Sequence, residues 1–474
     1  MTTEVSPQVR AAQRRATGIA LIASLGAFFY GFEGMVLNGA IKAVGVTFEL
    51  GAFAKGVAGA AGIIGALFGA FVAGRISDKI GRKKTLLCVA PFLLFEAIFG
   101  AFSPLFGDWG YAFLLLCRVI GGMGFGAATT VGPGYIAEIA PAHIRGRLIA
   151  FRQLEIIVGL FLAGVINMIV IEHAGSSEAE LALGLAAWQW MFLCLIIPAV
   201  FFTIMTATIP ESPRFLVSQG RMEEAKAVLA KVTGEDDLDS RVAAIRDSMG
   251  GENARTLSMR EIIHSPWMGL VWVAMMIAAF QQLTGINGIF FFSNTLFESV
   301  GFSEESAFQQ TLLITAFKLV GVGTGIALVD KVGRRNMLIG GGCLIAVSLG
   351  VVATVFTVAP VVDGNPDISD NKLLGYLAVG ALCTFILGFT SSWGPIFSIV
   401  MGEMFPNQIR GGAMSMASGA DFAVNLIVVL MFPYLIAWSP AFTYWMYCGF
   451  GVLSVIFTAK YLKETKGRQL EEMG

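Results

Sequence analysis

Twelve long apolar runs dominate this chain and limit what it can fold into. A transmembrane helix needs about 20 predominantly apolar residues to cross a hydrocarbon core of about 30 Å. Runs of this kind lie near residues 17–42, 56–74, 86–106, 111–133, 149–172, 185–208, 267–297, 309–329, 336–360, 373–397, 412–435 and 441–462. The sequence therefore predicts an all-α membrane protein with twelve transmembrane helices.

The composition supports a lipid environment. Hydrophobic residues make up 56% of the chain and charged residues only 14%, whereas soluble domains carry about a quarter charged residues. The formal net charge of -1 gives no reason to expect a nucleic-acid partner. The lipid bilayer is thus the expected partner of most of the surface.

The residue types that carry enzyme chemistry are sparse and scattered. The six cysteines lie singly in apolar runs, without CxxC or Cys/His spacing. The three histidines lie at or beside loops and show no nucleophile–base pairing, and no phosphate-cradling loop is present. We expect no enzyme activity, no metal, no cofactor and no ATP hydrolysis.

Basic residues gather in alternate loops and predict the orientation. They are Arg75, Lys79, Arg82, Lys83, Lys84, Arg145, Arg147, Lys331, Arg334, Arg335 and Arg410. Because cytoplasmic loops are enriched in lysine and arginine, we expect both termini in the cytoplasm and a multi-pass protein of the plasma or inner membrane. A small-residue cleavage site does not follow the first run, so we expect a retained span and not a signal peptide.

The two halves of the chain repeat each other. Residues 74–83 recur as residues 329–335, and residues 138–146 recur as residues 403–411. Duplicated halves are typical of secondary transporters with a midplane site. We expect a cytoplasmic tail at 1–16, an N-terminal six-helix bundle at 17–212, cytoplasmic linker helices at 213–262, a pseudo-symmetric C-terminal six-helix bundle at 263–462 and a second tail at 463–474.

Several motifs resemble those of the major facilitator superfamily, and more narrowly its sugar porter family. They are the two repeated loop motifs, Pro210-Glu-Ser-Pro-Arg214, Gln281-Gln-Leu-Thr-Gly-Ile-Asn287 and Glu464-Thr-Lys-Gly467. The resemblance implies a transporter that moves a small polar solute by alternating access, with proton symport. We expect a monomer whose solute is a sugar, a polyol or a sugar acid. A facilitative uniporter and a non-transporting nutrient sensor on the same scaffold are the alternatives.

Charged residues at the ends of helices are candidates for gating. The set comprises Asp78, Arg82, Glu138, Arg145, Asp330, Arg334, Glu403 and Arg410. Ion pairs among them could lock one end of a central cavity, and an exposed pair of this kind contributes only about 0–1 kcal/mol, so it can break in each cycle. The alternative is that these charges only anchor the topology.

Few ionisable residues lie in the middle of apolar runs, where charge is expensive and usually functional. Glu33 and Arg118 are a candidate proton switch, since an arginine near a carboxylate favours its ionised form; a permanent structural ion pair is the alternative. Lys318 and Asp421 both fall near the midplane of the C-terminal half. They are expected to line the cavity and contact solute, or else to form a buried pair that rigidifies this half.

The seventh run supplies the candidate solute site. Gln281, Gln282 and Asn287 carry amides that both donate and accept hydrogen bonds, as sugar recognition requires, and Asn425 matches a sugar-contacting position of the family. Other positions depart from the family pattern, namely Leu160, Ser398, Asp421 and Phe422. These departures leave the identity of the solute open.

Overall fold

The computed structural model describes residues 7–140, 142–233, 237–250, 259–299, 302–362, 365–366, 371–405, 409–462 and 464. The elements of the first half are α1 (Pro7–Thr47), α2 (Ala52–Ile80), α3 (Arg82–Ala101), η1 (Ser103–Trp109), α4 (Gly110–Ile139), α5 (Ala142–Ala174), β1 (Glu180–Ala182), β2 (Leu185–Ala186), α6 (Ala187–Leu193) and α7 (Ile196–Thr208). Four short helices follow: α8 (Pro213–Ser218), α9 (Met222–Val232), α10 (Leu238–Gly250) and α11 (Met259–Ile263).

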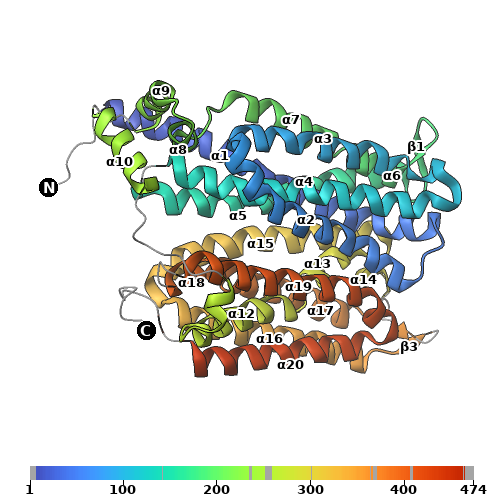
Figure 1. Ribbon diagram of the computed structural model, residues 1–474. Helices are drawn as coiled ribbons and strands as arrows, with labels where there is room; N and C mark the ends of the chain where they lie inside the picture. Colours follow the sequence, from blue (N-terminus) through green and yellow to red (C-terminus); the bar gives the residue numbers. More distant parts are fainter. Residues whose placement is uncertain are drawn as a thin grey trace. The chain divides into compact units, whose positions relative to one another are not determined.

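The elements of the second half are α12 (Met268–Leu283), α13 (Ile286–Phe291), α14 (Ser293–Ser299), α15 (Glu304–Val332), α16 (Arg334–Val358), β3 (Val361–Val362), β4 (Asn365–Pro366), α17 (Lys372–Ser391), α18 (Trp393–Met404), α19 (Arg410–Trp438) and α20 (Pro440–Tyr461). Figure 1 shows how these helices follow one another. The strands form two antiparallel hairpins, β1 with β2 and β3 with β4, which the sequence did not predict.

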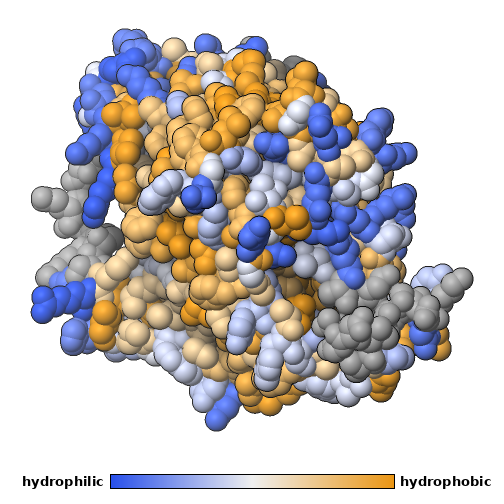
Figure 2. Space-filling view, turned by 90° about the vertical axis from the view of Figure 1, so that its right-hand side faces the viewer, coloured by the Kyte–Doolittle hydropathy of each residue, from blue (hydrophilic) through white to orange (hydrophobic). Residues whose placement is uncertain are grey.

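The predicted number of membrane spans is confirmed. Within the described part of the chain, twelve segments are long and apolar enough to cross a membrane. Several combine two helices, among them Met268–Phe291, which contains α12 and α13, and Leu373–Met401, which contains α17 and α18. Large apolar side chains such as Phe71, Ile197 and Val347 stay exposed on the outside of the helices, and apolar residues are widespread on the face in Figure 2. Lipid, not water, is the solvent that such a surface fits.

The chain forms two compact units that do not coincide with its two halves. The first unit contains Met1–Val36, Ala61–Ala163 and Gln189–Asn253. The second contains Leu37–Ala60, Gly164–Trp188 and Ala254–Gly474. The helices α1, α2, α5 and α6 are therefore shared, since each contains residues of both units.

Glycines bring the helices of the first unit close together. A Cβ at Gly65 would overlap the carbonyl oxygen of Val119, and one at Gly69 would overlap that of Met123. Small residues of this kind let transmembrane helices approach to backbone contact. The glycine face of α2 thus packs against α4, while α3 packs against α4 and α7.

The second unit is built on neighbouring helix pairs. The helix α16 packs against α17 and α20, α12 packs against α19, and α15 packs against α17. Aromatic side chains fill much of the interior, and Trp393, Tyr444 and Tyr447 are almost fully buried. The indole N–H of Trp393 donates to the carbonyl oxygen of Leu338 at 3.0 Å, which satisfies its polar atom inside an apolar core.

The linker helices α8, α9 and α10 pack against one another, as Figure 1 also shows. Helix α9 has an apolar stripe, and it buries Ala225, Val228 and Leu229 on one face. Leu216, Val217 and Val242 complete a small apolar cluster between the three helices. Lys226 joins α9 to α10 through Asp239 at 2.6 Å. The linker therefore has a small core of its own, although it belongs to the first unit.

Candidate functional site

The break between α12 and α13 positions the candidate solute residues. Gly285 adopts φ +80°, a left-handed conformation that a residue with a Cβ rarely takes. A Cβ there would also come within 2.8 Å of the Tyr447 ring. The glycine therefore ends α12 and lets α13 start at an angle, with Gln282 before the break and Asn287 after it.

Side-chain amides and one carboxylate form a connected network across this break. The amide of Gln282 donates to Asp421 Oδ1 at 2.8 Å, and the amide of Asn287 donates to Gln282 Oε1 at 3.0 Å and to Asn425 Oδ1 at 2.9 Å. The amide of Gln281 donates to the carbonyl oxygen of Trp393 at 3.2 Å. The structure thus joins four predicted residues, Gln282, Asn287, Asp421 and Asn425, and turns Gln281 toward α18.

Lys318 does not pair with Asp421. Among the described residues no ion pair links the two side chains, and the Nζ atom of Lys318 lies 3.2 Å from the centroid of the Phe290 ring. The side chain is only 7% exposed. A cation over an aromatic face is stabilised by the ring quadrupole, and more so when desolvated. The possibility of a rigidifying Lys318–Asp421 pair is therefore wrong for this structure.

In the first unit, Arg118 lies between two carboxylates. Its Nη1 atom pairs with Glu33 Oε1, as expected, and with Glu96 Oε1 at 2.9 Å. The three side chains come from α4, α1 and α3 and are at most 3% exposed. Gly62 on α2 leaves the room that the arginine occupies, because a Cβ there would lie 2.9 Å from Arg118 Nη2.

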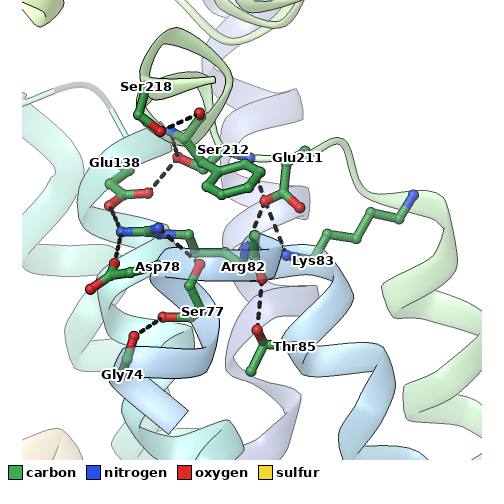
Figure 3. Close-up of polar contacts among 12 residues, drawn as sticks. Gly74, Ser77, Asp78, Arg82, Lys83, Thr85, Glu138, Glu211, Ser212 and Ser218 are labelled. Atoms are coloured by element: carbon green, nitrogen blue, oxygen red, sulfur yellow. Dashed lines mark hydrogen bonds and ion pairs between the residues drawn. The ribbon is translucent and has the colours of Figure 1, made fainter. Parts of the chain in front are cut away.

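The loop between α2 and α3 forms a second polar network, which Figure 3 shows. Arg82 pairs with Asp78 at 2.9 Å and with Glu138 at 2.9 Å. The hydroxyl of Ser212 donates to Glu138. Glu211 accepts from the backbone N–H groups of Arg82 at 2.8 Å and of Lys83 at 3.1 Å. A carboxylate at the start of α3 is favoured because the first N–H groups of a helix lack partners.

The second unit repeats this arrangement at the start of α16. Glu464 accepts from the backbone N–H groups of Arg334 at 2.9 Å and Arg335 at 3.1 Å. Arg334 donates to the carbonyl oxygen of Val329 at 3.3 Å, as Arg82 does to that of Ser77 at 3.1 Å. The side chains of Arg145, Asp330, Glu403 and Arg410 lie outside the described part, so their predicted pairings stay predictions.

A third polar cluster joins the last turns of α1 to α14 and α15 within the second unit. Lys42 pairs with Glu298 at 2.7 Å and with Glu304 at 2.9 Å, and Glu304 also accepts from the backbone N–H of Ser177 at 2.9 Å. One turn earlier, the amide of Asn38 donates to Ser293 Oγ at 2.9 Å and to the carbonyl oxygen of Phe290.

Several residues of these networks were not predicted from the sequence. Glu96 was detectable, since it is an ionisable residue inside the predicted run 86–106. Glu211 and Glu464 belong to the sequence motifs at residues 210–214 and 464–467, but no role was predicted for either side chain. Their capping role had no sequence signal, because each is distant in sequence from the helix that it caps. Lys42 gave a similarly weak signal at the end of an apolar run.

Comparisons with known proteins agree with this picture. Residues 19–474 match the family model described as sugar (and other) transporter. The chain is 38% identical over 456 residues to the glucose transport protein of Synechocystis sp., covering 95% of each chain. It is 32% identical to the D-xylose-proton symporter of Escherichia coli K12, covering 96% of this chain and 94% of that protein.

Solved structures show the same fold. The partially occluded, inward-open structure of the xylose transporter XylE from E. coli superposes with a TM-score of 0.82 at 28% identity, covering 96% of this chain and all of that one. The proton:xylose symporter XylE bound to 6-bromo-6-deoxy-D-glucose superposes with a TM-score of 0.75 at 29% identity. With twelve membrane spans and a matching family model, the chain belongs to the sugar transporter family of the major facilitator superfamily, and it is a secondary transporter and not an enzyme.

Proposed function

We propose that this protein carries a polyhydroxylated solute, a sugar or a polyol, through the membrane together with a proton. The observation that supports the solute class most directly is the network of Gln282, Asn287, Asp421 and Asn425. Amides and a carboxylate grouped at a helix break in a membrane are expensive unless polar groups satisfy them. The hydroxyl groups of a sugar both donate and accept hydrogen bonds, so they are suited to exchange with these partners.

The remaining proposed contacts follow from position. Gln281 precedes Gln282 on α12 and could turn from the Trp393 carbonyl toward solute. Lys318 is buried against Phe290, and Phe290 lies one turn after Asn287 on α13. The lysine would favour a solute with a carboxylate. The carboxylate of Asp421 opposes such a solute. Because Asp421 belongs to the network and Lys318 has no described contact with it, we favour a neutral solute.

Proton coupling is proposed for Glu33 with Arg118. The ionised form of Glu33 is stabilised by the arginine, and separation of the two would favour protonation. Buried carboxylates within membrane spans are commonly part of proton relays. The D-xylose-proton symporter and the arabinose-proton symporter of Bacillus subtilis, which is 28% identical over 99% of this chain, are named for such coupling.

Gating is proposed for the charged networks at the ends of α2, α8 and α16. Asp78, Arg82 and Glu138 would hold the cytoplasmic side of the first unit closed. Arg145, Asp330, Arg334, Glu403 and Arg410 are the further members of the proposed gate. The lysine and arginine residues of these loops support cytoplasmic termini. We propose that the protein works as a monomer by alternating access.

Two measurements test the proposal. Purified protein is first screened by thermal shift against D-glucose, D-xylose, L-arabinose, myo-inositol and D-glucuronate, since a bound ligand stabilises by mass action. The stabilising compound is then radiolabelled and its uptake into proteoliposomes is followed with and without an inward proton gradient. We expect a neutral compound to stabilise the protein and to accumulate above its external concentration only with the gradient.

Other outcomes identify the alternatives. Uptake that only equilibrates the solute, whatever the gradient, would show a uniporter. Binding without either uptake or counterflow would show a sensor. Stabilisation by D-glucuronate alone would contradict the neutral solute and point to Lys318 as its partner.

A further inference from the structure

We propose that Glu96 is a second proton-binding carboxyl group of this transporter, and that Glu33 and Glu96 share one proton around Arg118. The inference rests on the proposed proton coupling and adds a residue to it. Arg118 Nη1 contacts an oxygen of each glutamate, so the two carboxyl groups meet at one nitrogen of one cation.

Because the cluster of Glu33, Glu96 and Arg118 is buried, its net charge strongly affects its free energy. Glu96 is 0% exposed, Arg118 2% and Glu33 3%. With all three ionised the cluster would carry a net charge of -1, and an uncompensated charge inside a membrane protein is costly. One proton on either glutamate makes the cluster neutral, because the arginine then faces a single carboxylate.

Glu96 itself shows where such a proton fits. Its Oε1 atom accepts from Arg118, whereas its Oε2 atom is buried and has no hydrogen-bond partner among the described residues. A buried carboxylate oxygen without a partner is costly, and protonation removes the charge that causes the cost. Gly121 on α4 faces this oxygen so closely that a Cβ would overlap it. The pocket for Glu96 thus depends on a glycine.

Around Glu96 the described residues supply no second cation. The described elements packed against α3 include η1, α4, α7 and α6, and α6 has no ionisable side chain. On the side of Glu33, α5 packs against α1 and carries Arg152, which interacts with Tyr30 and Glu155. Helix α4 contributes Arg118 and the Cys117 thiol, which interacts electrostatically with Glu96; α7 has no ionisable side chain, and Asp108 of η1 is exposed. From α1, Glu33 faces the arginine. Among these groups Arg118 is the one cation that balances two carboxyl groups.

The geometry makes both glutamates necessary for coupling. With Glu33 alone, the arginine would stay paired and the site would be neutral without a proton. With Glu96 alone, the arginine would likewise stay paired and the site would be neutral without a proton. Two carboxyl groups that compete for one arginine therefore create a requirement for a proton that neither creates by itself.

The test compares Glu96→Gln with Glu33→Gln in proteoliposomes, using the sugar that stabilises the wild-type protein. Glutamine keeps the shape of the side chain and an acceptor for Arg118 but cannot take a proton. In both variants the internal-to-external sugar ratio should fall to about 1 under a proton gradient, because proton binding no longer contributes coupling free energy. Counterflow should stay within about twofold of wild type, since sugar binding in the second unit is untouched.

A second readout does not depend on transport. Infrared difference spectra of the purified protein between acidic and alkaline pH should contain the C=O stretching band of a protonated buried carboxyl group. The band should lose the contribution of one carboxyl group in Glu96→Gln and in Glu33→Gln, while other buried carboxyl groups such as Glu298 keep theirs. The matched control is Glu172→Gln on α5, whose side chain is exposed; it should keep both the band and accumulation.

Glu96→Gln with wild-type accumulation and an unchanged band would overturn the inference while leaving the proposed symport intact. If the wild-type protein itself fails to accumulate sugar, the proposed symport is wrong, and loss of this contribution to the band in Glu96→Gln still decides whether Glu96 binds a proton. If Glu96→Gln does not fold, Glu96→Asp retains a carboxyl group but withdraws it from Arg118. The inference then requires a shifted pH profile of uptake, and an unshifted profile would refute it.

Discussion

At the residue scale, the network around α12 depends on one amide that both donates and accepts. The nitrogen of Gln282 donates to Asp421, and its oxygen accepts from Asn287. An ionised carboxylate could not hold both partners, because it accepts hydrogen bonds but donates none. This places Gln282 at the centre of the proposed solute site.

Gln282→Leu should weaken solute binding and transport. The substitution removes the described side-chain partner of Asp421 and one of the two acceptors of Asn287. This costs about 1–3 kcal/mol, or roughly a 5-fold to 150-fold rise in KM. The measurement is KM for counterflow in proteoliposomes. Gln309→Leu on α15 is the matched control, since Gln309 is exposed. A KM within twofold of wild type for both variants would remove Gln282 from the site.

At the element scale, the span from α12 to α13 is broken by a conformation that only glycine takes easily. The apolar run over residues 267–297 divides into α12, α13 and α14. The left-handed φ of Gly285 and its contact with the Tyr447 ring both forbid a side chain. The break therefore belongs to the native structure and sets the direction of Asn287.

Gly285→Ala should destabilise this element and lower transport. A side chain in the left-handed region costs about 1–2 kcal/mol, and the Cβ would also lie 2.8 Å from the Tyr447 ring. Melting temperature and initial uptake rate should both fall. Gly269→Ala on the same helix is the control, because no atom lies within 4 Å of its Cβ. Equal melting temperatures for the two variants would contradict the argument.

The features predicted from the sequence are mainly those set by interactions within one helix or one loop. Most contacts between segments that are distant in sequence were not predicted. Apolar runs locate spans because lipid acts on each helix separately. The repeated loop motifs located Asp78 and Arg82, which are four residues apart and meet on adjacent turns. Arg82 also pairs with Glu138, which lies on another helix and 56 residues away in sequence, so spacing gave no sign of this contact. Contacts such as Glu211 with the start of α3 depend on packing that a single sequence does not encode locally.

At the scale of the whole molecule, the two units divide the shared helices. Residues 37–60 of α1 and α2 belong with the C-terminal helices, and the ion pairs of Lys42 with Glu298 and Glu304 lie inside that unit. Alternating access, as proposed, requires the ends of α1 and α2 to separate from these helices in part of the cycle. The ion pairs of Lys42 with Glu298 and Glu304 would then have to break. The contribution of this cluster to stability should depend on pH.

Glu298 determines the direction of that response. Burial has the largest effect on the Glu298 carboxyl group and raises its pKa above the usual 4.5, although Lys42 is adjacent. The folded protein then binds this proton more tightly than the unfolded chain does. The contribution of Glu298 to stability is therefore greatest below pH 4.5 and declines as pH rises through the elevated pKa.

Glu298→Gln holds this side chain in a neutral form. At neutral pH the variant should melt at a higher temperature than wild type, and the difference should vanish as pH falls toward 4.5, where wild-type Glu298 is itself protonated. Glu305→Gln, a substitution of an exposed neighbour, is the control. Melting curves of purified protein across this pH range make the comparison. A variant that melts below wild type at neutral pH would contradict this expectation, because the ion pair with Lys42 would then outweigh the cost of burial. The cluster would in that case stabilise the protein at neutral pH and lose this contribution when acid protonates Glu298.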